Sequence, residues 1–226
     1  MQRYNMFTQI HKGLRALLYE TAMKVQHTDF WNVDEGEAAI NQVSEVVRLF
    51  EKHAHAEDTY VFPAIQKYEP SIADAFEQEH VKDHQLGEEL IGAINQYRFA
   101  EIITEKAEAG REIYPAYVKF MVFNLEHMGK EEEILNPIFW RYYTDTDLLA
   151  VTREIVANIP PDYMAQFSRW MMRGLSNPEI TYWLRSVERE APEVVFQALF
   201  TTAEKELSEK RFRQVLEGLT GGAMVA

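Results

Sequence analysis

The chain has 226 residues, a formal net charge of -13 at pH 7 and no cysteine. The lack of cysteine excludes disulfides, thiolate metal sites and cysteine-ligated iron–sulfur clusters. The negative charge disfavours nucleic acid and anionic membranes as partners, and no apolar run approaches the roughly 20 residues of a membrane-spanning helix. We therefore expect a soluble cytoplasmic protein with neither a nucleic-acid nor a membrane partner.

Hydrophobic residues recur at helical spacing along almost the whole sequence. Four long amphipathic helices are predicted at residues 5–26, 34–67, 71–99 and in a segment ending at 143. Gly110 falls in the predicted break before the fourth helix, and Pro115 suits the first turn of that helix. Pro63 and Pro137 should kink or end their helices. Together these features predict an all-α, up-and-down antiparallel four-helix bundle over residues 1–144.

The sequence from 145 to 217 predicts a C-terminal helical extension of unknown role, and 218–226 predicts a disordered tail. Three helices of the extension open with a proline and an acid: Pro161-Asp162, Pro178-Glu179 and Pro192-Glu193. We favour ordinary helix starts over an internal repeat, because both residue types suit a helix N-terminus. The large apolar residues of the extension would cap the bundle, which we favour, or form a homodimer interface: Trp170, Met171, Met172, Trp183 and Phe196.

Ionisable side chains interrupt the apolar stripes of all four bundle helices. Five of the seven histidines fall on these stripes: His11, His53, His80, His84 and His127. Glu57 and Glu131 each follow a histidine by four residues and so share its helix face. His27 and His55 fall on outward faces. Buried ionisable groups are costly unless they are paired or bind metal, so the pattern predicts a metal site.

Seven protein ligands are too many for one ion and suit two. Two carboxylates can bridge a pair of ions while imidazoles fill terminal positions, and helix bundles often build such sites from facing helices. If three histidines bind one ion and two bind the other, one ion keeps an open position for a small ligand. An oxo or hydroxo group would form a further bridge between the ions. Asp58 and Glu132 lie about 140° from the histidines of their helices and should face outward, although Glu132 stays an alternative to Glu131. The donor set suits iron, and zinc or manganese could bind the same residues.

Four motifs carry a resemblance to a known family. They are Ile10-His11-Lys12, His53-x-x-x-Glu57 with Phe62-Pro63, Glu79-His80-x-x-x-His84, and His127-x-x-x-Glu131 with Ile134 and Pro137. Over about the first 145 residues the chain resembles the hemerythrin-like (HHE cation-binding) family. The resemblance implies a four-helix bundle with a non-haem, carboxylate-bridged di-iron centre. The ligands it implies are His11, His53, Glu57, His80, His84, His127 and Glu131.

The resemblance also guides the expected function. In the oxygen-carrying branch the last carboxylate is typically an aspartate five residues after its histidine, whereas Glu131 follows His127 by four. That spacing resembles the branches linked to iron sensing and iron–sulfur repair. We expect a binding protein that takes O2, NO or a related small ligand for sensing, storage or carriage. The alternatives are a di-iron enzyme acting on peroxide, NO or ferrous iron, an iron-homeostasis or stress protein, or an interaction protein whose working part is the C-terminal extension.

Overall fold

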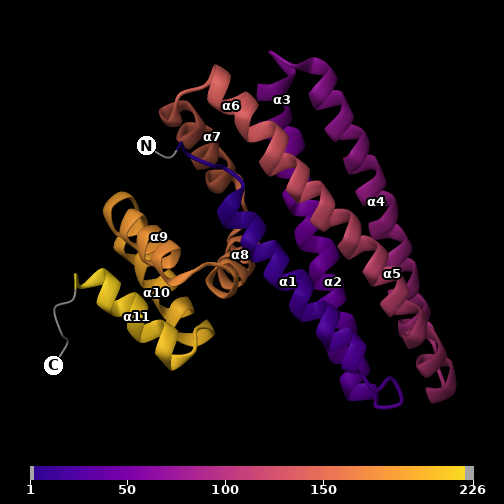
Figure 1. The fold of residues 1–226 in the computed structure, drawn as a ribbon. Coiled ribbons are helices and arrows are strands. Elements are labelled where there is room, and N and C mark those ends of the chain that lie inside the picture. The colour runs from indigo at the N-terminus through magenta and orange to yellow at the C-terminus, as the bar shows by residue number, and fades with distance from the viewer. Residues whose placement is uncertain (1–2, 222–226) are drawn as a thin grey trace. The chain divides into compact units, whose positions relative to one another are not determined.

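The computed structural model describes residues 3–221, and every regular element in this range is helical (Figure 1). The predicted all-α fold is therefore confirmed. Packing divides the chain into two compact units. The first holds the described residues up to Thr8 and those of Leu17–Ile159, and the second holds Gln9–Ala16 and the described residues from Pro160 onward.

The long helices of the bundle run up and down along one another in Figure 1. They are α1 (Thr8–His27), α2 (Val33–Ala56), α4 (Pro70–Phe99) and α5 (Ile103–Lys130). Asn32 starts α2, because its side chain accepts hydrogen bonds from the backbone N–H groups of Asp34 and Glu35. Inside the bundle, the buried Tyr117 hydroxyl on α5 donates to the Leu18 carbonyl on α1 at 2.8 Å.

Helices α2 and α5 each pass through a short π-helical segment near the same end of the bundle. The segment Glu57–Val61 joins α2 to α3 (Phe62–Gln66), and Glu131–Leu135 joins α5 to α6 (Asn136–Tyr142). A core of buried side chains lies at this end: Phe7, Val61, Phe62, Ile65, Ala73, Phe76, Leu135, Phe139 and Leu148. Of these, Leu148 belongs to α7 (Asp145–Asn158), so α7 is part of the first unit.

The predicted break at Gly110 is wrong, and the connection between the third and fourth long helices lies at residues 100–102. Gly110 lies inside α5, where an added Cβ would meet the ring of Phe30 at 2.2 Å. Glycine here therefore serves close packing and not a turn. Pro115, expected in the first turn, likewise lies in the interior of α5.

The boundary between the units lies after residue 159, later than the expected boundary at 144–145. The predicted tail begins inside a helix, because α11 (Glu209–Leu219) includes residues 218 and 219. The part of that prediction at 222–226 lies outside the described residues.

A 16-residue period runs through the C-terminal helices, where we favoured ordinary helix starts over an internal repeat. After α7, the elements α8 (Pro161–Gly174), α9 (Asn177–Glu190), α10 (Glu193–Glu206) and α11 each start 16 residues after the previous one. The fourth, seventh and eleventh residues of all five helices are apolar. The three prolines concealed the period because they take different positions in their helices: first residue, second residue and N-cap.

The second unit has its own apolar core, formed by Met172, Leu175, Ile180, Leu184, Leu199, Ala203, Leu207 and Val215. Of the residues offered for a homodimer interface, Met172 belongs to this core, and Met171, Trp183 and Phe196 pack against it. Trp170 is also buried. Most of their apolar surface is thus used within the chain, and a homodimer through these helices stays a prediction.

Candidate metal centre

Two of the bundle helices carry the same arrangement of a histidine, a glutamate and a proline. Glu57 follows His53 by four residues and precedes Pro63 by six, and Glu131 has the same spacing from His127 and Pro137. Each glutamate is the first residue of a π-helical segment. A proline cannot donate the backbone hydrogen bond of a regular helix, and each wider turn ends two residues before the proline. Such π-helical turns occur often at functional sites.

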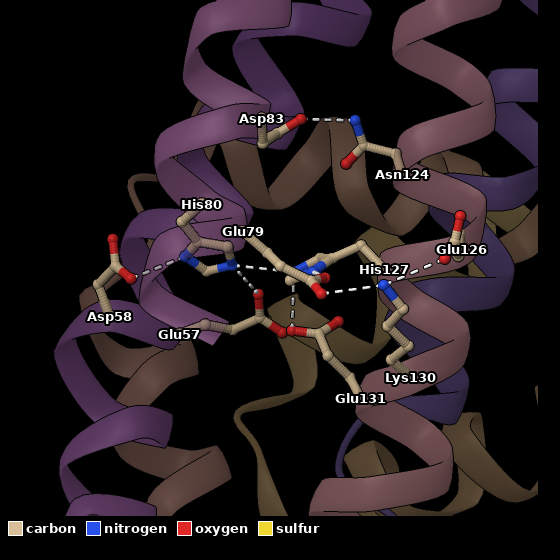
Figure 2. Close-up of polar contacts among 10 residues, drawn as sticks. All are labelled: Glu57, Asp58, Glu79, His80, Asp83, Asn124, Glu126, His127, Lys130 and Glu131. Carbon is tan, nitrogen blue, oxygen red and sulfur yellow. Dashed lines mark hydrogen bonds and ion pairs between the residues drawn. The ribbon is translucent and has the colours of Figure 1, made fainter. Parts of the chain in front are cut away.

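Glu57, Glu131 and His127 face one another inside the bundle, together with His80 of α4 (Figure 2). His53 lies beside Glu57. Nε2 of His53 lies 3.3 Å from Oε1 of Glu57, and Nε2 of His80 lies 3.5 Å from Oε2 of the same carboxylate. Nε2 of His127 lies 3.2 Å from Oε1 of Glu131. The two carboxylates are almost completely buried, with exposures of 3% for Glu57 and 0% for Glu131.

The two glutamates are shared between two sets of ligand atoms. One oxygen of Glu57 and one of Glu131 lie within 4.8 Å of each other and of a His53 nitrogen. The same two carboxylates also form a set with His80 and His127, again with all ligand atoms within 4.8 Å. The two buried carboxylates thus belong to both candidate metal-binding groups.

The outer nitrogens of two imidazoles face further carboxylates. Nδ1 of His80 lies 2.7 Å from Asp58, and Nδ1 of His127 lies 2.8 Å from Glu79. A carboxylate accepts a hydrogen bond, so each Nδ1 carries the donated proton. Each Nε2 is thereby left as the inward-facing donor atom for a metal, as in carboxylate–histidine–metal arrangements.

The inner nitrogens of His80 and His127 approach each other to 3.0 Å. Two lone pairs at this distance repel unless a proton or a cation lies between them. Burial lowers the pKa of His80, but the hydrogen bonds with Asp58 and Glu57 outweigh burial and raise this pKa to about 10. Burial also lowers the pKa of His127, but its contacts with Glu131, Glu57 and Glu79 outweigh burial, so that the pKa is raised overall. The cluster therefore attracts positive charge strongly.

His84, expected to face inward, does not join the cluster. Its side chain is 64% exposed and lies 3.4 Å from the equally exposed Glu88. Asp83 takes the inward position and accepts a 2.6 Å hydrogen bond from Asn124 Nδ2 (Figure 2). Positions three and four residues after His80 lie on either side of its direction, and α4 is rotated so that the third one points inward. Burial raises the pKa of Asp83, and the Asn124 hydrogen bond opposes that rise only in part.

Comparison with known proteins gives a family assignment. The model of the Hemerythrin HHE cation binding domain matches residues 2–139, more than half of the chain. The chain belongs to this family. F-box/LRR-repeat protein 5 of Xenopus tropicalis is 22% identical over 68% of this chain and 22% of its own length, and that of Salmo salar is 20% identical over 76% and 24%. A zinc finger protein BRUTUS-like of Arabidopsis thaliana is 22% identical over 76% of this chain and 14% of its own length.

The chain thus spans about a quarter or less of the length of these relatives. No solved structure matches it significantly. Among the described residues, no helix has both the length and the apolar character needed to cross a membrane.

Within this hemerythrin-type bundle the remaining predicted residues have distinct outcomes. Glu131 is buried and Glu132 is only partly buried, so the predicted inward direction of Glu131 is confirmed. Ile134, quoted with the His127 motif, is 40% exposed, while Leu135 is buried, within the π-helical turn. His11 is fully buried, but its segment Gln9–Ala16 packs with the second unit, and its role as a ligand stays a prediction.

Sequence reasoning missed the outer carboxylates. Asp58 was expected to face outward; its side chain is 49% exposed, yet it reaches back to a ring nitrogen of His80. Glu79 was quoted only as part of a motif, and it accepts from both His127 and Lys130. A signal was present, since each acid is adjacent in sequence to a residue of the cluster. Its partner lies on another helix, which a helical wheel does not show.

The donor set fits the cation that the family implies. The inward-facing atoms are imidazole Nε2 and carboxylate oxygen, which first-row transition metals prefer. The partners on Nδ1 hold His80 and His127 in the tautomer that a metal ligand needs. The two buried carboxylates also place negative charge beside two closely facing imidazoles, and a bound cation would neutralise that charge.

Proposed function

We propose that this protein binds two non-haem iron ions and takes O2, NO or a related small ligand at an open metal position. The observation that supports this most directly is that Glu57 and Glu131 belong to two sets of ligand atoms, one with His53 and one with His80 and His127. The two carboxylates would bridge the ions, with an oxo or hydroxo group as a further bridge. The terminal ligands would be the predicted histidines without His84: His11, His53, His80 and His127.

Leaving His84 out of the proposed ligand set changes the number of histidines expected on each ion. The predicted contrast of three histidines against two depended on His84, which lies outside the cluster. Four histidines over two ions leave more than one position for exogenous ligands, so the open position is not restricted to one ion by the histidine count. Iron would supply the redox-active centre that binds the small ligand.

The surroundings of the cluster suit an oxygen- or NO-binding site, because aromatic rings exclude water from it. The ring of Phe62 lies 4.8 Å from that of His80, and Phe123 stacks on His127 with 6.1 Å between ring centroids. Phe76 also contacts His127. Excluding water from buried charges strengthens their interactions, and it limits the access of protons to the reduced centre.

The decisive experiment is an anaerobic optical titration of the reduced, iron-reconstituted protein with O2. An iron-dependent spectrum that appears with O2 and disappears on deoxygenation would support binding for sensing, storage or carriage. Irreversible oxidation with turnover of peroxide, NO or ferrous iron would instead support the alternative, a di-iron oxidoreductase. If two iron ions remain bound per chain after Glu57→Ala substitution, the proposed bridging ligands are wrong.

A further inference from the structure

The two imidazoles of the inner pair have acidic partners in unlike surroundings. Asp58, which pairs with His80, is about half exposed. Among the described residues, His80 is its only ion-pair partner. Glu79, which pairs with His127, also binds Nζ of Lys130 at 2.9 Å. The structure therefore places a lysine charge beside one carboxylate–imidazole pair and not beside the other (Figure 2).

The lysine itself is part of a short chain of charges on α5. Its Nζ lies 3.1 Å from Glu126, four residues earlier, in addition to Glu79 on α4. Lys130 is 38% exposed and Glu79 is 28% exposed, so solvent screens this pair in part. Lys130 nonetheless neutralises part of the negative charge of Glu79, because its Nζ lies within direct hydrogen-bond distance of that carboxylate.

A carboxylate on the outer nitrogen of a metal-binding histidine has two effects. It fixes the ring orientation with Nε2 toward the metal, and its negative charge makes Nε2 a stronger donor. A cation bound to the same carboxylate weakens the second effect and leaves the first intact. By this reasoning Asp58 should increase the donor strength of His80 more than Glu79 increases that of His127.

We propose that Asp58 and Glu79 are positioning residues of the metal centre, and that Lys130 makes His80 and His127 unequal donors by withdrawing charge from Glu79. The inference rests on the proposed metal-binding function. It assigns a role to three residues outside the ligand set, and it makes the two imidazoles distinguishable although they face the same pair of carboxylates.

Zinc affinity, measured by competition with a chromophoric chelator, tests the charge effect without iron chemistry. Asp58→Asn should weaken Zn²⁺ binding about ten-fold, the lower end of the range for such outer partners. Glu79→Gln should weaken it by a smaller factor, and Lys130→Met should strengthen it about two-fold, since the pair it breaks is partly exposed. Glu88→Gln is the matched control: it alters the exposed carboxylate–histidine pair with His84 and should change nothing.

Nitrogen-15 NMR of the histidine rings in the zinc-loaded protein tests the orientation effect. Asp58→Asn keeps an oxygen that can accept from Nδ1, so His80 should still bind through Nε2. Asp58→Ala removes the acceptor, and the His80 ring should lose its single tautomer, with a larger loss of zinc affinity. Far-ultraviolet circular dichroism confirms that each variant folds.

The possible failures are separable. If the unaltered protein binds neither zinc nor iron, the proposed function fails and the inference fails with it. If the unaltered protein binds metal but Asp58→Asn behaves like Glu88→Gln, only the positioning role is overturned. A loss of affinity in Lys130→Met as large as in Glu79→Gln would show that Lys130 braces Glu79 structurally, which overturns the proposed inequality.

Discussion

Replacing His84 with alanine tests the point at which the family resemblance and the structure disagree. The resemblance assigns His84 as a metal ligand, whereas the structure places its side chain in solvent beside Glu88. An exposed pair spaced four residues apart on a helix contributes about 0.3–0.5 kcal/mol. His84→Ala should therefore change the free energy of unfolding by less than about 0.5 kcal/mol and leave the metal content unchanged.

His80→Ala is the informative comparison, because His80 lies one turn away on the same helix. Its Nε2 faces Glu57 at 3.5 Å and His127 Nε2 at 3.0 Å. Loss of a group that only orients a ligand typically costs 10–100-fold in metal affinity, so loss of the ligand itself should cost at least about 100-fold. The assay is metal content per chain after reconstitution and gel filtration, with affinity from chelator competition. If His84→Ala loses one of two ions while remaining folded, our account of α4 is refuted.

Three further predictions concern stability. Tyr117→Phe removes the buried hydrogen bond to Leu18 and should cost about 1 kcal/mol, lowering Tm by about 2–4 °C in differential scanning calorimetry. Gly36→Ala should destabilise by about 1–3 kcal/mol, because its Cβ would meet the buried Tyr97 hydroxyl at 2.0 Å; a chemical denaturation midpoint equal to that of the unaltered protein would contradict this. His80 has a pKa raised to about 10 in the metal-free protein, so its stabilising contribution is complete below about pH 6.5 and is lost as pH rises through the folded pKa. Tm of the metal-free protein should fall across this window, and bound metal should remove that part of the fall.

Much of the bundle could be predicted from sequence, because the burial of its helices follows the 3.6-residue period. Leu14 and Leu18, which are four residues apart on α1, are both buried. The inward directions of Glu57, Glu131 and their histidine neighbours also follow from a spacing of four residues, which keeps two side chains on one face. Local periodicity is sufficient for such pairs, because both members lie on one regular turn.

The misplaced residues lie where local periodicity does not determine the outcome. Asp83 and His84 are equally compatible with the stripe through His80, and the choice depends on Asn124, which donates to Asp83 from another helix. Leu135 is buried and Ile134 is exposed in the π-helical segment that follows α5. Gly110 looked like a helix break because its packing partner, Phe30, lies far away in sequence.

The π-helical segments also connect these register changes to the chemistry of the site. Each begins at a shared carboxylate and ends two residues before a proline. In the segment Glu57–Val61 the widened turn is closed by a hydrogen bond from the Phe62 N–H to the Glu57 carbonyl, five residues earlier. Glu57 is followed by buried apolar residues at 61 and 62, and the second of them lies at the five-residue spacing of the widened turn. The widened turn thus joins a buried carboxylate of the cluster to two apolar side chains of the core at this end of the bundle.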